Sequence, residues 1–556
     1  MRRYPLLALA ALSLVTTQAI AGEQPGLRIK LTPVKTQGQL SGIQVEETFK
    51  TAGQALAPLS LASRLGPLAE IDSRIHDIKL VDAKGAIALK DGTAPSTIIP
   101  GGSNHTWTPG RQSQGPVTLS YIADVSHLTI PGPTWELRSE ARGISGSGIT
   151  FLILPEDKRQ YQVKLSWDLS AIGKDASTLD SLPQNGQGSL DRILQSYFMA
   201  GHLLQKSAGP FKIASTAKTH NFSQQSLLDW IEKAYFKLSA LYGNNAPPPF
   251  TVALRTNTLT TISGTALPQS LMSIMSPDVS KSDIESLMAH EMTHVFLYGT
   301  DPQSWFQEGL AMTYQDRAPF ATGLIGMSQY INGVNQVLRS YYSNVRKHIS
   351  MQEGEKAFWT DARARLVPYD RGALYFMVTD GRLRAKSANK NNLDKVLRQF
   401  MDNYRAGKPA LAKDWLALLG QYLDKSTVEK DYQTMLTGQG TLVPPEQSFG
   451  PCFTRVKQQM PLFELGFDIS SLMHNPKIIK GLNPDSAAAK AGLRNGDVVT
   501  NPIGLDESQA HPSHTMTLVV NRAGKTLNIR FKPEGKLTEG YQWQARKGAK
   551  GDQCRL

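Results

Sequence analysis

The sequence has no concentrated run of basic residues, although its formal net charge is +13. Lysine and arginine are dispersed along the chain, and no stripe of basic and aromatic residues accompanies them. Proteins that bind nucleic acid usually concentrate both residue types on one face. We therefore expect no nucleic-acid partner. The hydrophobic content of 40% and the charged content of 19% are typical of a globular protein, so nothing favours disorder.

An apolar run long enough to cross a membrane is missing from the N-terminus, where the chain begins "MRRYPLLALAALSLVTTQAIAGE". A spanning helix needs about 20 apolar residues. The two arginines, the short apolar run and the Ala19-Ile20-Ala21 ending are instead typical of a secretory signal peptide. We expect cleavage after Ala21 and a periplasmic or secreted protein without a transmembrane anchor. The alternative is an uncleaved N-terminal anchor.

Cysteine is scarce, because the chain holds only Cys452 and Cys554. In the oxidising compartment that export implies, two cysteines that flank one segment are expected to form a disulfide. The bridge would enclose the C-terminal part of the chain. Two unrelated free thiols are the alternative, since a bridge requires Cα atoms within about 7 Å of each other.

The length of 556 residues is too great for a single hydrophobic core, so we expect a multidomain α+β protein. Short alternating stretches such as "GIQVEETF" and "VTLSYIADV" predict an N-terminal antiparallel β-sandwich. Helical patterns follow, beginning with "LDRILQSYFMAGHLL" and "SLLDWIEKAYFKLSALYG", and predict a mainly helical domain. The expected parts are a signal peptide (1–21), the β-sandwich (22–190), the helical domain (191–448) and a C-terminal domain (452–556).

The stretch "SKSDIESLMAHEMTHVFLYG" carries the strongest chemical signal. It predicts a helix opened by a capping box of Ser282 and Glu285. On a helix, positions i and i+4 share one face, so His290 and His294 can both direct a ring nitrogen at one metal ion. Glu291 then lies beside them. The alternative is an ordinary helix whose histidines only pack or face solvent.

A third metal ligand is available in "WFQEGLAMTYQD", a second helical stretch that contains Glu308. The set His290, His294 and Glu308 leaves a fourth position open for water, as a catalytic zinc ion requires. We therefore expect one Zn²⁺ per chain. Glu291 would act as the general base that takes the proton of the attacking water.

These two motifs resemble a known pattern. "HEMTH" followed by "WFQEGLAMTY" is similar to the HExxH and W-x-x-E-G pattern of the gluzincin peptidases, shared by the aminopeptidase N and glycyl aminopeptidase families. The resemblance implies a thermolysin-like catalytic domain. "VPYDRGALYFM" resembles a further aminopeptidase N segment, and by that resemblance the hydroxyl of Tyr369 helps to hold the oxyanion. A buried core tyrosine is the competing interpretation.

The C-terminal domain contains "FELGFDI" and "KGLNPDSAAAKAGLRNGDVVT", which together resemble a PDZ domain. The amides of Leu465, Gly466 and Phe467 would receive the C-terminal carboxylate of a peptide ligand, which would add as a strand. Asp485 or Ser486 would cap the Ala-rich helix. The alternative is a packing module whose groove is blocked.

A β-sandwich, a gluzincin-like domain and a PDZ domain in this order resemble the glycyl aminopeptidase family over nearly the whole mature chain. The resemblance implies a zinc aminopeptidase that removes small N-terminal residues, Gly or Ala, from peptide or protein substrates. One departure is the gap between His294 and Glu308, which is shorter than members of either family usually show.

A larger departure precedes the zinc helix, where these aminopeptidases carry a Gly-x-x-Glu segment whose glutamate binds the free amine of the substrate. Here the stretch is "ISGTALPQSLMSI", with Leu267 or Pro268 in that position. We expect Gly264 and Thr265 to form a turn. Two alternatives to the aminopeptidase remain: an endopeptidase tolerant of blocked N-termini, and a catalytically weak peptide-binding or chaperone-like protein.

Overall fold

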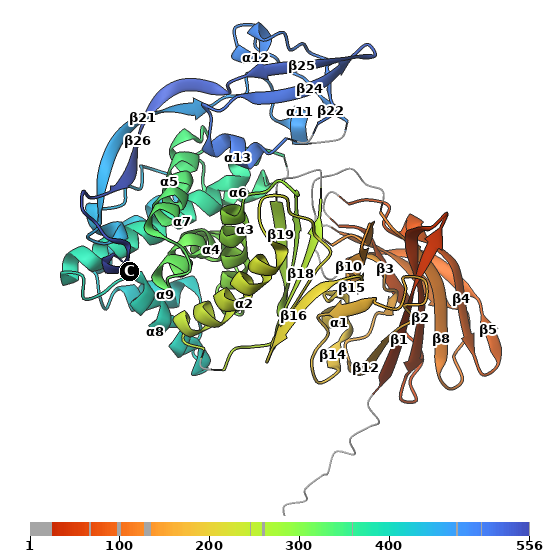
Figure 1. Cartoon of the computed structure of the whole chain (residues 1–556). Helices are drawn as coiled ribbons and strands as arrows, with labels where there is room; N and C mark the ends of the chain where they lie inside the picture. Colours follow the sequence, from red (N-terminus) through yellow and green to blue (C-terminus); the bar gives the residue numbers. More distant parts are fainter. Residues whose placement is uncertain are drawn as a thin grey trace, which may run out of the picture.

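The computed structural model describes residues 25–65, 68–96, 102–126, 135–244, 246–257, 262–358, 360–473, 476–501, 503–554 and 556. The expected signal peptide, 1–21, lies outside these residues. Among the described helices, none is both long and apolar enough to cross a membrane. The β-rich N-terminal part, the central part with most of the helices and the C-terminal part follow one another along the chain, and the C-terminal part lies above the central helices in Figure 1.

The N-terminal part is built from sheets that enclose a main apolar core and a smaller apolar cluster. The largest sheet has the order β14-β12-β1-β2-β8-β4-β5, and a second has the order β11-β3-β7-β6. Its strands are β1 (Gly26–Thr36), β2 (Gln39–Lys50), β3 (Leu59–Arg64), β4 (Ile75–Asp82), β5 (Gly85–Ile87), β6 (Leu89–Pro95), β7 (Ser103–Pro109), β8 (Val117–Asp124), β9 (Arg138–Glu140), β10 (Gly143–Ser147), β11 (Leu154–Pro155), β12 (Gln160–Trp167), β13 (Ser177–Asp180), β14 (Gln187–Ser189) and β15 (Tyr197–Gly201).

Alternation explains this core, because side chains on one face of β1, β2 and β8 are buried while their neighbours are exposed or half-buried. The pairing is antiparallel as expected except between β1 and β12, which run parallel. The short helices of this part are η1 (Asp72–Arg74), η2 (Gly148–Thr150) and α1 (Leu190–Leu194).

The helix expected over "LDRILQSYFMAGHLL" is wrong beyond Leu194. α1 ends there, and β15 pairs with β10 and β13 in the sheet β13-β15-β10-β9. All residues of β15 are buried. A strand buried on both faces is a continuous apolar run, which periodicity cannot distinguish from a buried helix.

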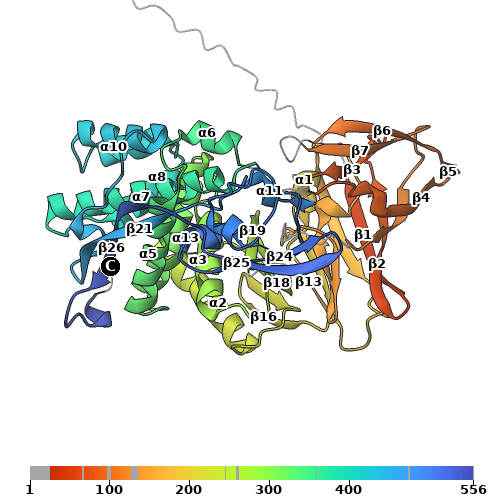
Figure 2. The same ribbon diagram turned by 90° about the horizontal axis from the view of Figure 1, so that it is seen from above.

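The central part combines the sheet β16-β17-β18-β20-β19 with helices that cover it. In Figure 2 the sheet lies between the N-terminal strands and the helices. Its elements are β16 (Leu204–Ala208), β17 (Phe211–Ser215), α2 (Gln224–Leu241), β18 (Phe250–Thr256), β19 (Ile262–Leu267), β20 (Ser270–Met275), α3 (Lys281–Phe296), α4 (Ser304–Ala321), α5 (Met327–Ser343), α6 (Met351–Lys356), α7 (Ala362–Ser387), α8 (Leu393–Arg405), α9 (Ala412–Leu419), α10 (Lys425–Thr437) and η3 (Glu446–Phe449).

The helix α3 begins two residues earlier than expected. Its N-cap is Ser280, whose hydroxyl accepts a hydrogen bond from the amide of Asp283 at 3.1 Å. The capping box of Ser282 and Glu285 is therefore wrong. An N-cap residue has extended backbone angles, and Ser280 has them (φ −75°, ψ 148°), whereas Ser282 is already helical. Glu285 instead accepts a hydrogen bond from Gln329 of α5.

The C-terminal part joins a long ribbon to a small sheet. Its elements are β21 (Phe453–Phe463), α11 (Ser470–Met473), β22 (Lys477–Ile478), α12 (Ala487–Lys490), β23 (Val498–Val499), α13 (Leu505–Ala510), β24 (Met516–Arg522), β25 (Lys525–Phe531), β26 (Glu534–Ala545) and η4 (Gly551–Gln553). The β21–β26 ribbon runs beside α5 (Figure 1). A disulfide joins Cys452 to Cys554, with Cα atoms 5.5 Å apart. Ser486, not Asp485, caps α12.

Candidate metal centre

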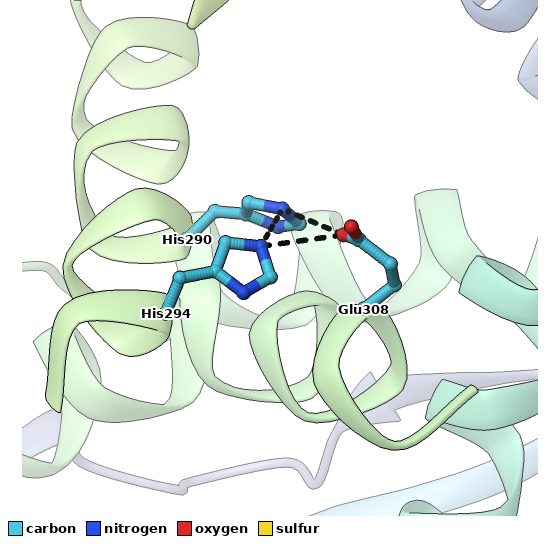
Figure 3. Close-up of side chains that lie close together, drawn as sticks. All are labelled: His290, His294 and Glu308. Carbon is cyan, nitrogen blue, oxygen red and sulfur yellow. Dashed lines mark hydrogen bonds and ion pairs between the residues drawn. The ribbon is translucent and has the colours of Figure 1, made fainter. Parts of the chain in front are cut away.

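Two helices bring the three predicted ligands together. His290 and His294 lie one turn apart on α3, and Glu308 projects toward them from α4 (Figure 3). The Oε2 atom of Glu308 is 3.4 Å from Nε2 of His290 and 3.3 Å from Nε2 of His294. The two ring nitrogens are 3.3 Å apart. The three donors therefore form a nearly equilateral triangle.

The size of this triangle fits a zinc ion. Nitrogen and oxygen ligands of tetrahedral zinc lie about 2.0–2.1 Å from the metal, which places them about 3.3–3.4 Å from one another. Apart from the two imidazole rings, no described residue hydrogen-bonds the buried Oε2 atom of Glu308. A buried carboxylate oxygen with only ring nitrogens around it is suited to a cation.

The electrostatics favour an ionised carboxylate. Burial raises the pKa of Glu308, but the hydrogen bonds and charges of the two histidines together lower it well below its ordinary range. Burial likewise lowers the pKa of His294, whereas the contact with Glu308 raises it to about 9 overall. A histidine that binds a metal ion must be neutral. Metal binding should therefore displace the proton that the raised pKa favours on His294, and protons should be released.

Glu291 is buried and lies next to the edge strand β19. A Cβ placed on Gly264 would be 3.0 Å from Oε1 of Glu291, so this strand approaches the glutamate closely because residue 264 has no side chain. Gly264 and Thr265 are therefore strand residues, and the turn expected there is wrong. Burial raises the pKa of Glu291, against the lowering effect of His290 and His294.

Tyr369 comes from the second turn of α7 and lines the same cleft as the three ligands. Burial raises the pKa of its hydroxyl well above the ordinary value, and the charges of Glu308 and Glu291 add to the rise. The hydroxyl therefore stays protonated at neutral pH and can act as a hydrogen-bond donor.

The cleft around these residues encloses about 3090 Å³ and is lined by all three parts of the chain. Trp135 and Arg192 come from the N-terminal part, and Asp506 and His511 come from the C-terminal part. Pockets for small ligands usually enclose about 300–1,000 Å³. This cleft is large enough for an extended polypeptide.

Of the two residues expected in the amine-binding position, Leu267 or Pro268, the first ends β19 and the second directly follows it. Leu267 is half-buried and packs against an apolar cluster that contains Leu179, Tyr197 and Met199 of the N-terminal part together with residues of the central sheet. The hydroxyl of Tyr197 donates to the carbonyl of Thr265 at 2.9 Å, which fixes β19 against this neighbouring part. At Leu267 the chain therefore has an apolar side chain, not the glutamate of the Gly-x-x-Glu segment described above.

Several cleft residues could not be found from sequence motifs. Asp316 follows Glu308 by two turns of α4 and accepts a hydrogen bond from Ser286 of α3 at 2.6 Å. Its spacing from Glu308 was the one available clue. Arg365 of α7 forms an ion pair with Asp506 of α13 at 2.7 Å, and nothing in either local sequence marks this pair.

Leu465, Gly466 and Phe467 form the loop that follows β21. Gly466 has a φ of 80°, and a Cβ there would be 2.3 Å from the Cβ of Ser486, so the position requires glycine. Leu465 and Phe467 are buried in the core of the C-terminal part. The assignment of this part as a PDZ domain stays a prediction.

Comparison with solved structures identifies proteins that have a similar fold. No protein-family model and no curated protein matches the sequence. Among solved structures, an aminopeptidase N family protein from Idiomarina loihiensis aligns with 95% of this chain and 99% of its own, at 14% identity and a TM-score of 0.65. An M1 zinc metallopeptidase from Deinococcus radiodurans aligns with 76% of this chain and 96% of its own, at 16% identity and a TM-score of 0.42. Leukotriene A4 hydrolase from Saccharomyces cerevisiae aligns with 76% of this chain and 69% of its own, at 13% identity and a TM-score of 0.44. The chain therefore shares the overall fold of the Idiomarina aminopeptidase N family protein.

Proposed function

We propose that the protein is an exported zinc metallopeptidase that hydrolyses peptide bonds. The observation that carries this proposal is the triangle of His290, His294 and Glu308, whose edges of 3.4, 3.3 and 3.3 Å fit tetrahedral zinc. Glu291 and Tyr369 line the same cleft and supply a base and a proton donor. The fold of the Idiomarina protein, which is named as an aminopeptidase N family member, supports the same class.

The chain's own residues would divide the chemistry between them. Zinc held by the three ligands would polarise the scissile carbonyl and make a water molecule more acidic. Glu291 would take the proton of the attacking water and pass it to the leaving amine, and its raised pKa suits both steps. Tyr369 would donate its hydroxyl hydrogen to the oxygen on which negative charge develops.

The finer specificity follows from the resemblance to glycyl aminopeptidases. On that basis the substrates would be peptides that begin with a small residue, Gly or Ala. Leu267 favours a second candidate, an endopeptidase that accepts blocked N-termini, because an apolar side chain cannot pair with a substrate ammonium. The size of the cleft is compatible with both.

Export to the periplasm or the medium is part of the proposal. The signal-like N-terminus supports it, and so does the disulfide between Cys452 and Cys554, since such bridges persist in oxidising compartments. For the C-terminal part, the resemblance would give a PDZ domain with a C-terminal peptide ligand. A catalytically weak peptide-binding protein is then the alternative to an enzyme, and the complete set of ligands, base and tyrosine argues against it.

Metal analysis combined with a cleavage assay tests the proposed function. The purified full chain should contain about one zinc per molecule and should cleave an unstructured protein such as casein. A chelator should abolish cleavage, and added zinc should restore it. Protein that binds no zinc after reconstitution, or cleavage that a chelator leaves unchanged, would contradict a metallopeptidase.

A further inference from the structure

The start of α7 lies between two elements of the C-terminal part. Ala362, the first residue of α7, is 2% exposed and belongs to the same apolar core as Phe467, Ile469 and Leu505. Of the buried residues described in that core, Ala362 is the one that comes from the central part. The central part therefore inserts the first residue of α7 into the apolar core of the C-terminal part.

The two elements that contact this helix end are the segment after β21 and the helix α13. On one side, Phe467, Asp468 and Ile469 share a small cavity of about 390 Å³ with Asp361 and Arg363. On the other side, Arg365 of α7 forms its 2.7 Å ion pair with Asp506 of α13. The Nε atom of Arg339 on α5 also donates to the carbonyl of Ala510, at 3.3 Å.

In a PDZ domain these are the two elements that enclose a peptide ligand, and the loop of Leu465, Gly466 and Phe467 stands at the end of that groove. Here the first turn of α7 lies between the segment after β21 and the helix α13. Phe467 is 8% exposed and Ile469 is 5% exposed in the full chain, so little of this apolar surface is left for an external ligand.

The same turn of α7 leads directly to Tyr369. Ala362, Arg365 and Tyr369 follow one another at helical spacings of three and four residues and so share one face. Pro368 interrupts the backbone hydrogen bonding of the helix immediately before Tyr369, because proline has no amide hydrogen to donate to Ala364. The first turn of α7 therefore lacks one backbone hydrogen bond to the rest of the helix, and contacts with the C-terminal part contribute more to its position.

We propose that the first turn of α7 occupies the peptide groove of the C-terminal part, and that the Arg365–Asp506 ion pair, through this contact, positions Tyr369 for catalysis. Arg365 and Asp506 are then positioning residues, and the C-terminal part serves the active site instead of recruiting a peptide. The positioning role rests on the proposed peptidase function, and the occupied groove rests on the PDZ resemblance of the C-terminal part.

The kinetic arm uses single variants and their combination. Asp506→Asn and Arg365→Asp should each lower kcat about tenfold with zinc content and KM unchanged, because only the transition state uses the tyrosine hydroxyl. The double variant Arg365→Asp/Asp506→Arg should recover most of kcat. The matched control is Glu539→Gln, which removes one charge from the exposed Lys457–Glu539 pair on the ribbon and should leave kcat unchanged. An unchanged kcat in Asp506→Asn, a rise in KM alone, or no recovery in the double variant would overturn the positioning role.

The structural arm needs no activity, so it separates this inference from the proposed function. Amide hydrogen exchange over 465–470 and 505–510 should increase in Arg365→Asp and return to the wild-type level in the double variant. A fluorescent peptide that ends in a free valine carboxylate should not bind the full chain carrying Glu291→Gln, which prevents its cleavage. Binding that is lost when the same peptide carries a C-terminal amide would show an open groove and overturn the proposal.

Discussion

Gly309 of α4 and Gly372 of α7 touch backbone to backbone: a Cβ on Gly309 would lie 2.6 Å from the carbonyl carbon of Gly372. The contact is reciprocal, since a Cβ on Gly372 would lie 3.0 Å from the Cα of Gly309 and 2.5 Å from the carbonyl oxygen of Trp305, also on α4. Glu308 directly precedes the first glycine, and Tyr369 lies three residues before the second. One close helix contact therefore sets the distance between Glu308 and Tyr369.

We predict that Gly309→Ala lowers both stability and activity. The added methyl group must push α4 away from α7, and overpacking of this kind costs about 1–3 kcal/mol. Urea unfolding should show the loss of stability, and zinc titration should show weaker binding. Gly420→Ala is the control, because its nearest neighbour would be at an ordinary 3.5 Å and its backbone is helical. Wild-type zinc affinity in Gly309→Ala would contradict the role of this contact.

A second prediction separates the base from the ligands. Glu291→Gln should keep zinc and the folded structure but lower turnover by several orders of magnitude, since it removes the base alone. His290→Ala should instead lose zinc. Metal analysis and a peptidase assay on the same preparations distinguish the two effects. Wild-type turnover in the glutamine variant would exclude Glu291 as the base.

A third prediction concerns Tyr369. The Tyr369→Phe variant keeps the ring and removes the hydroxyl donor, so kcat should fall about 10²–10³-fold while KM changes little. Steady-state kinetics on one peptide, with zinc content measured in parallel, provide the test. If KM rises and kcat does not change, the tyrosine binds substrate but does not stabilise the transition state.

The buried carboxyl of Asp370 predicts a pH dependence of stability. Burial raises its pKa to about 8, against the hydrogen bond from Ser340, which lowers it. The ordinary value in an unfolded chain is about 3.9, so between about pH 4 and pH 8 the folded state binds more protons than the unfolded state. This group therefore contributes stability at low pH that is lost as the pH rises through about 8.

Asp370→Asn should remove this dependence, because an amide stays neutral and can still accept the bond from Ser340. Relative to the wild type, the variant should gain stability as the pH rises from about 5 to about 9. Urea unfolding of both proteins across that range gives the measurement. A difference in unfolding free energy that stays constant with pH would show that Asp370 is already ionised in the folded protein.

The local chemistry of the site was predictable, whereas the contacts between parts of the chain were not. The spacing of His290 and His294 on a helix, and the second helix carrying Glu308, follow from periodicity and residue type alone. The ion pair between Arg365 and Asp506 joins residues 141 positions apart, and no local pattern encodes it. The strand β15 was mistaken for helix for a related reason, since only its neighbours β10 and β13 decide its conformation.

The last prediction concerns the amine of the substrate. An aminopeptidase gains its register by pairing the substrate ammonium with a carboxylate near the metal, and a buried ammonium without a partner is costly. At the end of β19 the structure offers Leu267, which packs against the apolar cluster that includes Leu179 and Tyr197, and the cleft residues of the N-terminal part include the cation Arg192. The wild-type protein should therefore cleave an Ala-leading peptide and its acetylated form at similar kcat/KM.

Leu267→Glu should introduce a preference for the free amine of about tenfold or more, whereas Leu267→Gln, which has the same shape without the charge, should not. A strong wild-type preference for the free amine would show that another carboxylate in the cleft anchors the substrate, and the endopeptidase alternative would then fail.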